Sequence, residues 1–190
     1  MAFNALLVVS NTALGEIAHE LGSTIEPELQ RSFLATEEAI EELWDEPTGL
    51  YYSRHGVTGE LLVSPTVAAF LPLWAGVAKP ARARRLIGHL AEPSTFWPSC
   101  PVPSVPIDAP PFDDDRYWKG PTWVNTNWMI VEGLRNYGAN DVADDLRHRT
   151  LGLVHAAGFA EYFSALTGVP YGADEFSWTA ALTLDLLARA

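Results

Sequence analysis

The sequence predicts an all-α protein built as an array of helical hairpins. Three observations support this fold class. Apolar residues recur at helical spacing in most segments, prolines stand where helices would begin, and short turns alternate with long loops. Runs that alternate between apolar and polar residues, as strands do, are almost missing. We therefore expect residues 1–190 to form a single domain without an internal boundary.

Seven helices are expected along the chain. Gly22 is a natural stop for the first, and Pro27 opens the second. Pro65, Pro80 and Pro121 open three more, because the first turn of a helix has free amide positions and tolerates proline. The expected helices cover residues 4–21, 27–44, 65–73, 80–90, 121–137, 140–157 and 175–189.

Three long segments between the helices lack helical periodicity. Residues 45–62 read as a loop or short hairpin, residues 92–116 are rich in proline, and residues 158–174 form a third loop. Loops of about 25 residues are uncommon in compact domains and are usually functional. A weak internal echo supports repetition, because WDEPTG at 44–49 and FSALTG at 163–168 share a Thr-Gly step after an aromatic residue.

Composition restricts the classes of partner. A formal net charge of -12 argues against nucleic acid and against an anionic membrane surface. No segment has the roughly 18 apolar residues of a membrane span. Cys100 is the only cysteine, so an internal disulfide is impossible and a cytoplasmic location is the simplest expectation. Seven tryptophans and six tyrosines suit a small carbohydrate or glycoside as ligand.

A tryptophan-rich segment, DRYWKGPTWVNTNW at 115–128, combines aromatic and amide side chains at the start of an expected helix. On that helix Asn127 shares the apolar stripe of Trp123. Its amide therefore either braces a neighbouring loop or contacts a ligand at the open helix end. Tyr117 and Trp118 precede the helix on the proline-rich loop, where they either pack or face a pocket.

The second candidate segment is GFAEYFSALTGVPYGADEFSWTAAL at 158–182. Glu161 lies there between a glycine and two aromatic residues, at the end of an expected helix. Taken alone, such a glutamate is either a solvated or capping residue or a group that transfers protons.

Together, the two segments resemble the C-terminal half of the catalytic domain of glycoside hydrolase family 63, especially its smaller bacterial mannosylglycerate and glucosylglycerate hydrolase-type members. The family's Tyr-Trp-Arg-Gly-Pro-x-Trp-x-Asn-x-Asn-Trp pattern corresponds to YWKGPTWVNTNW at 117–128. Its later Glu, Thr-Gly, Gly-Ala and Phe-Ser-Trp elements correspond to Glu161, Thr167-Gly168, Gly172-Ala173 and Phe176-Ser177-Trp178. Segments such as LWDEPTGLYY and FLPLWAG extend the likeness through the chain.

The resemblance implies part of an (α/α)6 toroid and an inverting α-glucosidase or α-mannosidase-like hydrolase. In inverting enzymes one carboxylic acid protonates the departing oxygen, while a second carboxylate takes a proton from the attacking water. By its place in the motif, Glu161 would be this general base. We expect no metal ion and no other cofactor. The substrate-binding residues that the resemblance implies are Tyr117, Trp118, Gly120, Trp123 and Asn127.

Three departures from the family pattern bear on activity. Lys119 replaces the usual arginine and exchanges a planar fork of donors for a point charge. Ser164-Ala165 stands where an Asp/Asn-Pro step is common, which we expect to loosen the loop after Glu161. The family's general acid lies in the first half of the toroid, ahead of anything that aligns here, and a closed ring has about 12 helices.

We therefore expect a truncated or split catalytic domain that lacks its general acid and hydrolyses little or nothing alone. The apolar faces of its terminal helices would be open to a complementary N-terminal half or to self-association. The expected substrates are small glycosides such as glucosylglycerate or mannosylglycerate.

Other functions stay open at this stage. A helical scaffold can bind sugars without chemistry, and a sugar epimerase on the same toroid would use paired histidines, although none lies near the tryptophan-rich motif. Residues 113–115 could hold calcium or simply form a solvated acidic loop. The five histidines lack zinc-site spacing, and Cys100 lacks a neighbouring histidine that would support a thiol nucleophile.

Overall fold

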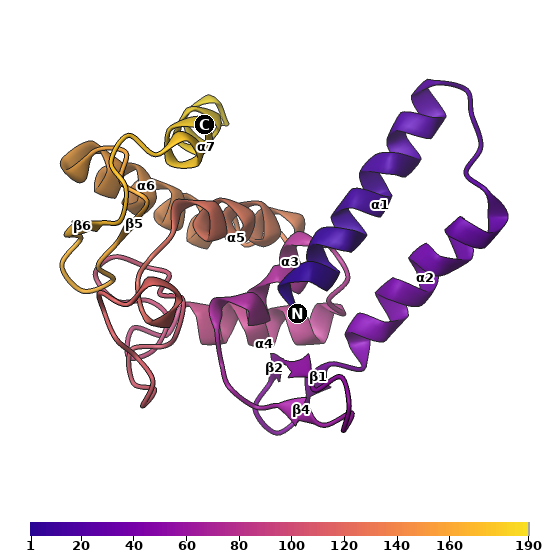
Figure 1. Ribbon diagram of the computed structural model, residues 1–190, viewed down its shortest axis with the longest axis horizontal. Coiled ribbons are helices and arrows are strands. Elements are labelled where there is room, and N and C mark those ends of the chain that lie inside the picture. Colours follow the sequence, from indigo (N-terminus) through magenta and orange to yellow (C-terminus); the bar gives the residue numbers. More distant parts are fainter. Residues whose placement is uncertain (190) are drawn as a thin grey trace.

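The computed structural model describes residues 1–189 and consists mainly of helices (Figure 1). The α-helices are α1 (Ala2–Glu20), α2 (Pro27–Glu41), α3 (Leu71–Trp74), α4 (Pro80–Leu90), α5 (Val124–Asn136), α6 (Asn140–Ala157) and α7 (Ser177–Ala188). Two 3₁₀ segments are η1 (Val67–Phe70) and η2 (Tyr117–Lys119). The short strands are β1 (Trp44–Asp45), β2 (Leu50–Tyr51), β3 (Ser53–Arg54), β4 (Leu61–Leu62), β5 (Tyr162–Phe163) and β6 (Pro170–Tyr171).

The odd-numbered helices form one layer, and the even-numbered helices pack against it. In the first layer α1 contacts α3, α3 contacts α5, and α5 contacts α7. In the second, α2 packs on α1, α4 packs on η1, and α6 packs on both α5 and α7. The prediction of an all-α array of helical hairpins is therefore confirmed (Figure 1).

The main core lies between these two layers. Phe70, Leu86, Ile130 and Leu146 come from four different elements, and all four are completely buried. Burial of a side chain of this size contributes about 1.5–3 kcal/mol, so these contacts are the main force that holds the layers together.

Of the four helix starts predicted at prolines, two are confirmed and two are wrong. α2 and α4 begin at Pro27 and Pro80, as expected. The helix expected from Pro65 begins at Val67 as a 3₁₀ segment, and the helix expected from Pro121 begins only at Val124. The backbone before Val124 is extended because it pairs with a distant loop, a contact that local sequence patterns do not report.

Two other helix boundaries differ from the predicted ones for similar reasons. α2 ends at Glu41, because Trp44 pairs with Tyr51 in the β1–β2 hairpin. α7 begins at Ser177, because Glu175 has a positive φ of 52° that ends any helical turn there. The segment 45–62, expected to be a loop or short hairpin, contains the β1–β2 turn and the β3–β4 hairpin.

The internal echo between WDEPTG and FSALTG is confirmed as a shared turn. In the β1–β2 turn, the Asp45 carboxylate accepts hydrogen bonds from the Thr48 N–H at 2.9 Å and from its hydroxyl at 2.7 Å. In the β5–β6 turn, the Ser164 hydroxyl oxygen accepts the same two bonds from Thr167, at 2.9 and 2.8 Å. The glycine that follows each threonine has a positive φ. The repeat unit is therefore an even-numbered helix followed by a hairpin.

The terminal helices have open apolar faces, as predicted. The α1–α2 hairpin extends away from the other helices in Figure 1, and α7 lies at the opposite end of the layer. Exposed apolar side chains on these three helices are Phe3, Leu6, Leu7, Leu14, Ile17, Leu29, Leu34, Trp178, Leu184 and Leu187. Within residues 1–189, none of the helices combines the length and the apolar character that crossing a membrane requires.

A charged contact fastens α7 to α5. The indole N–H of Trp128 donates to the Asp185 carboxylate at 2.6 Å, and Arg189 pairs with the same carboxylate at 2.8 Å. The indole hydrogen bond, aided by Arg189, lowers the pKa of Asp185 below its ordinary value of 3.8.

This contact makes the stability of the fold depend on pH. Because the pKa of Asp185 is lowered in the folded state, its ionised form stabilises the fold above the ordinary pKa, and this contribution is lost as the pH falls through the folded value. Urea unfolding at about pH 7, 5 and 3 should show Asp185→Asn less stable at neutral pH and the gap closing in acid. A gap that is constant with pH would contradict this. Glu16→Gln, an exposed change on α1, is the control.

Candidate functional site

The long loops meet at one end of the odd-numbered layer, because each leads from an even-numbered helix into an odd-numbered one. Backbone hydrogen bonds join them. The Val67 N–H donates to the Ser104 carbonyl at 3.1 Å, and Thr122 and Phe163 exchange two bonds of 2.8 and 3.0 Å. The start of α5 is thereby fixed between the neighbouring loops.

A stack of aromatic rings occupies this junction. Trp123, the residue before α5, lies parallel to Trp118 with 3.9 Å between ring centroids and an interplanar angle of 4°. The ring of Tyr162 from β5 stacks on the Trp123 ring with 4.7 Å between centroids, and the Tyr117 ring contacts the Trp123 ring edge-on at 5.0 Å. The exposed rings of Tyr117 and Trp118, which are 50% and 40% exposed, therefore rest on a buried tryptophan.

Glu161 lies beside this stack at the entry to β5. The Tyr117 hydroxyl donates to its Oε1 at 3.3 Å, and the Ala173 N–H donates to its Oε2 at 3.2 Å. Gly172 leaves room for the carboxylate, since a Cβ there would collide with the Glu161 side chain. Its positive φ of 76° also favours glycine. The carboxylate is thus oriented by two donors from separate loops.

Two further features of the tyrosines around Glu161 bear on the site. Burial, together with the Glu161 carboxylate, raises the pKa of Tyr162 above its ordinary value of 10.0. Tyr117 adopts a positive φ of 42°, a conformation that costs a non-glycine residue about 1–3 kcal/mol and is concentrated at functional sites. Its ring contacts with Trp118, Trp123 and Tyr162 offset this strain.

Three of the predicted substrate-binding residues are buried. Trp123 and Asn127 have no exposed surface, and Gly120 is buried where a Cβ would overlap the Asp113 carbonyl oxygen. Asn127 accepts a bond from the Val102 N–H at 3.0 Å. It also donates to the Pro101 carbonyl at 2.8 Å and the Thr150 hydroxyl at 2.9 Å. Of the two roles left open for Asn127, the structure shows the brace between α5, α6 and the proline-rich loop.

A groove of about 490 Å³ adjoins Trp118, between the N-terminal ends of α1 and α5. We call it the Trp118 groove. Its lining is mainly apolar and includes a few hydroxyl and amide groups, and none of its lining side chains is ionisable, a combination that suits a neutral ligand ring. The lining residues are Ala2, Phe3, Leu6, Thr66, Val67, Ala68, Leu71, Ser104, Trp118, Asn125, Thr126 and Met129.

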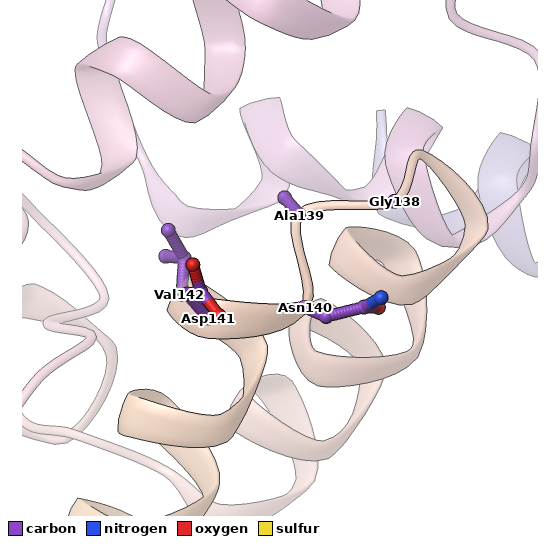
Figure 2. A pocket seen from close by; sticks show the side chains of 5 residues that line it. All are labelled: Gly138, Ala139, Asn140, Asp141 and Val142. Carbon is purple, nitrogen blue, oxygen red and sulfur yellow. The ribbon is translucent and has the colours of Figure 1, made fainter.

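A second pocket, of about 270 Å³, lies at the turn between α5 and α6 (Figure 2). It is lined by Gly138 to Val142, so it has no aromatic surface on which a sugar could stack. Its one carboxylate, Asp141, belongs to the first turn of α6, where acidic residues stabilise the helix. This pocket is a feature of the turn and carries no candidate chemistry.

The acidic loop is tied to protein groups. The half-buried Asp114 accepts hydrogen bonds from the Ser164 hydroxyl and from the Ala165 N–H, the latter at 2.9 Å. Across residues 1–189, no three His, Cys, Asp or Glu side chains gather as a metal site would require. The expectation that Ser164-Ala165 loosens the loop after Glu161 is wrong, because Ser164 is completely buried and hydrogen-bonded.

The thiol of Cys100 is a poor nucleophile in this setting. Burial, together with the charge of Asp114, raises the pKa of Cys100 above its ordinary value of 9.0, which disfavours the reactive thiolate. Its backbone instead joins the loops, since its N–H donates to the Ala165 carbonyl at 2.9 Å.

Sequence reasoning missed two residues of the site. From the sequence, Tyr162 is only an aromatic neighbour of Glu161, and Asp114 is only part of an acidic loop that is either solvated or bound to calcium. Tyr162 and Phe163 are neighbours in the short strand β5, and because side chains alternate along a strand, a strand prediction there would have placed them on opposite faces. No local signal links Asp114 to a residue 50 positions later.

Comparison with known proteins agrees with this architecture. The profile of the family described as "Mannosylglycerate hydrolase MGH1-like glycoside hydrolase domain" matches residues 1–179. Mannosylglycerate hydrolase from Rubrobacter radiotolerans is 37% identical over 188 residues, which cover 97% of this chain and 42% of that protein. Glucosylglycerate hydrolase from Mycolicibacterium hassiacum is 30% identical over 152 residues, 78% of this chain and 34% of that protein.

A solved structure extends the likeness to three dimensions. The GH63 mannosylglycerate hydrolase from Thermus thermophilus, in complex with Tris and D-glycerate, superimposes with a TM-score of 0.90 at 38% identity. The superposition covers 99% of this chain and 45% of that chain, so the present chain spans less than half the length of these relatives.

The fold and the family match place these helical hairpins in the (α/α)6 toroid class of glycoside hydrolase domains. The chain belongs to the mannosylglycerate hydrolase MGH1-like family, within glycoside hydrolase family 63.

The bracing role of Asn127 can be tested by substitution. Asn127→Ala leaves the Val102 N–H without its buried acceptor and is expected to lower the free energy of unfolding by about 2–4 kcal/mol. Chemical denaturation measures this change, with the exposed Asn4→Ala as control. Unchanged stability together with lost sugar binding would contradict the bracing role.

Proposed function

We propose that this chain carries the general-base side of the active site of an inverting glycoside hydrolase. The observation that carries the proposal is the position of Glu161, held by Tyr117 and Ala173 at the edge of an exposed aromatic surface. Sugar rings stack on such surfaces through their apolar faces, while a carboxylate beside them can reach the water that attacks the anomeric carbon. Glu161 is the base, and Tyr117 and Trp118 border the reacting sugar.

The proposed reaction is a single displacement. Glu161 takes a proton from water as the water oxygen bonds to the anomeric carbon. The bond from that carbon to the leaving oxygen breaks at the same time, and a carboxylic acid on the other side of the sugar gives this oxygen its proton. The Tyr117 and Ala173 hydrogen bonds fix the Glu161 carboxylate, so the base does not need to reorient before it reacts.

The three buried residues support this surface. Trp123 backs Trp118 with a parallel ring, Gly120 allows the loop to approach Asp113, and Asn127 fixes the start of α5. We place the reacting sugar against Trp118 and in the adjoining groove, whose lining is uncharged. The names of the relatives support small glycosides of glycerate, with mannose or glucose as the sugar.

The catalytic acid, in this proposal, comes from helices outside these 190 residues, on the same or another polypeptide. The apolar faces of α1, α2 and α7 support this, because further helices of a ring would cover them. A relative more than twice as long superimposes on this chain over only 45% of its own length. The 190 residues alone should therefore hydrolyse glycosides very slowly or not at all.

Complementation tests the proposal. The chain is to be co-expressed with the portion of the Thermus thermophilus enzyme that lies outside the superimposed region, and sugar release from mannosylglycerate and glucosylglycerate followed by NMR. We expect release only when both parts are present, with inverted anomeric configuration, and a loss of about 10²–10⁴-fold in Glu161→Gln.

Glu175→Gln is the matched control, because Glu175 is an exposed carboxylate of the same loop. It should keep nearly full activity. Turnover by the 190 residues alone would contradict an external acid, and full activity of Glu161→Gln would contradict the assignment of the base.

A further inference from the structure

The two related turns of the chain differ in how they supply a hydrogen-bond acceptor. In the β1–β2 turn a carboxylate, Asp45, accepts from both groups of Thr48. In the β5–β6 turn the acceptor for Thr167 is the Ser164 hydroxyl. A hydroxyl carries one proton of its own, so it can serve as acceptor for two donors only if that proton is directed elsewhere.

The Ser164 hydroxyl donates its hydrogen bond to the Asp114 carboxylate. Its Oδ2 accepts the Ser164 hydroxyl hydrogen, and its Oδ1 accepts the Ala165 N–H at 2.9 Å. In the β5–β6 turn, Ser164 and Asp114 together provide the acceptor for Thr167, whereas in the β1–β2 turn the Asp45 carboxylate alone is the acceptor for Thr48. The difference is that Asp114 belongs to the proline-rich loop, so the turn is now fastened to a distant segment.

The segment that carries Asp114 also carries one side of the candidate site. Tyr117 follows three residues later and donates to Glu161, while Ser164 follows Glu161 by three residues. The Asp113 N–H donates to the Lys119 carbonyl at 2.8 Å, and this bond closes a turn that contains both Asp114 and Tyr117. The Asp114–Ser164 and Tyr117–Glu161 hydrogen bonds therefore join the same two loops at two points.

We infer that Asp114 is a positioning residue for the general base: through Ser164 it holds the loop of Glu161 at a fixed distance from Tyr117. This inference rests on the role proposed above for Glu161. It accounts for the serine of this chain at a position where the related turn has an aspartate. Without Asp114, the Ser164 hydroxyl loses its hydrogen-bond acceptor. The turn that follows Glu161 then loses its attachment to the proline-rich loop.

The first experiment does not depend on catalysis. Hydrogen exchange followed by mass spectrometry on the 190-residue protein should show about tenfold faster exchange at 161–169 in Asp114→Ala, as a local opening predicts. Asp115→Asn removes an exposed neighbouring charge and should leave exchange unchanged. Unchanged protection in Asp114→Ala would overturn the inference. Should that variant not fold, Asp114→Asn, which keeps the shape but not the second acceptor, replaces it.

A swap of the two residues gives a sharper control. The double variant Asp114→Ser/Ser164→Asp places a carboxylate in the turn, as Asp45 does, and leaves a hydroxyl at 114 to donate to it. We expect the swap to restore most of the lost protection, whereas Ser164→Asp alone should not, because two carboxylates would then face each other. A swap no better protected than Asp114→Ala would count against the pairing.

The second experiment uses the complemented enzyme. Asp114→Ala should lower kcat about tenfold and leave KM within about twofold, since a displaced base affects the transition state more than substrate binding. It should cause no further loss in a Glu161→Gln background, because it acts through that residue. An undiminished kcat, or an independent loss in that background, would overturn the inference. If the wild-type complemented enzyme is itself inactive, the proposed function fails and the positioning role fails with it, even where exchange has changed.

Discussion

The paired backbone hydrogen bonds between Thr122 and Phe163 are the constraint on which the candidate site depends. Both residues are completely buried, so breaking the pair would leave buried amide and carbonyl groups unsatisfied at a cost of about 1–3 kcal/mol each. Thr122 directly precedes Trp123, and Phe163 follows Glu161 by two residues. One antiparallel bridge therefore sets the separation of the aromatic stack and the carboxylate, although they lie on loops from different helical hairpins.

Much of the helical framework could be predicted from sequence, because helix periodicity and prolines at first turns are local signals. Pro27 and Pro80 begin helices as expected, whereas Pro121 does not. The residues after Pro121 are extended because Thr122 pairs with Phe163, and a contact across 41 positions leaves no trace in local periodicity. The same limit applies to the site. Its tryptophans and Glu161 were apparent, but which of them are buried was decided by packing between distant loops.

Burial distinguishes tryptophans that form the exposed surface of the candidate site from tryptophans that support this surface, which composition alone does not. Trp118 and Trp123 lie in one motif, yet Trp118 is 40% exposed and Trp123 has no exposed surface. The buried ring gives the exposed one a flat, rigid support at 3.9 Å. In the proposed function, a rigid support lowers the entropy lost when a sugar stacks on Trp118, so Trp123 would contribute to affinity without touching the sugar.

The repeated hairpin shows how a structural unit becomes a candidate catalytic one. Glu42 precedes Asp45 by three residues, as Glu161 precedes Ser164, and Glu42 forms an ion pair with Arg54 at 3.2 Å. The residue in the place of Arg54 is Ala173, which offers Glu161 only its backbone N–H. A guanidinium pairs with the Glu42 carboxylate, whereas a backbone amide and a phenol orient the Glu161 carboxylate. In the proposed function, the small residue in place of the cation leaves the Glu161 carboxylate free of an Arg54-like partner, so that it can orient and deprotonate the attacking water.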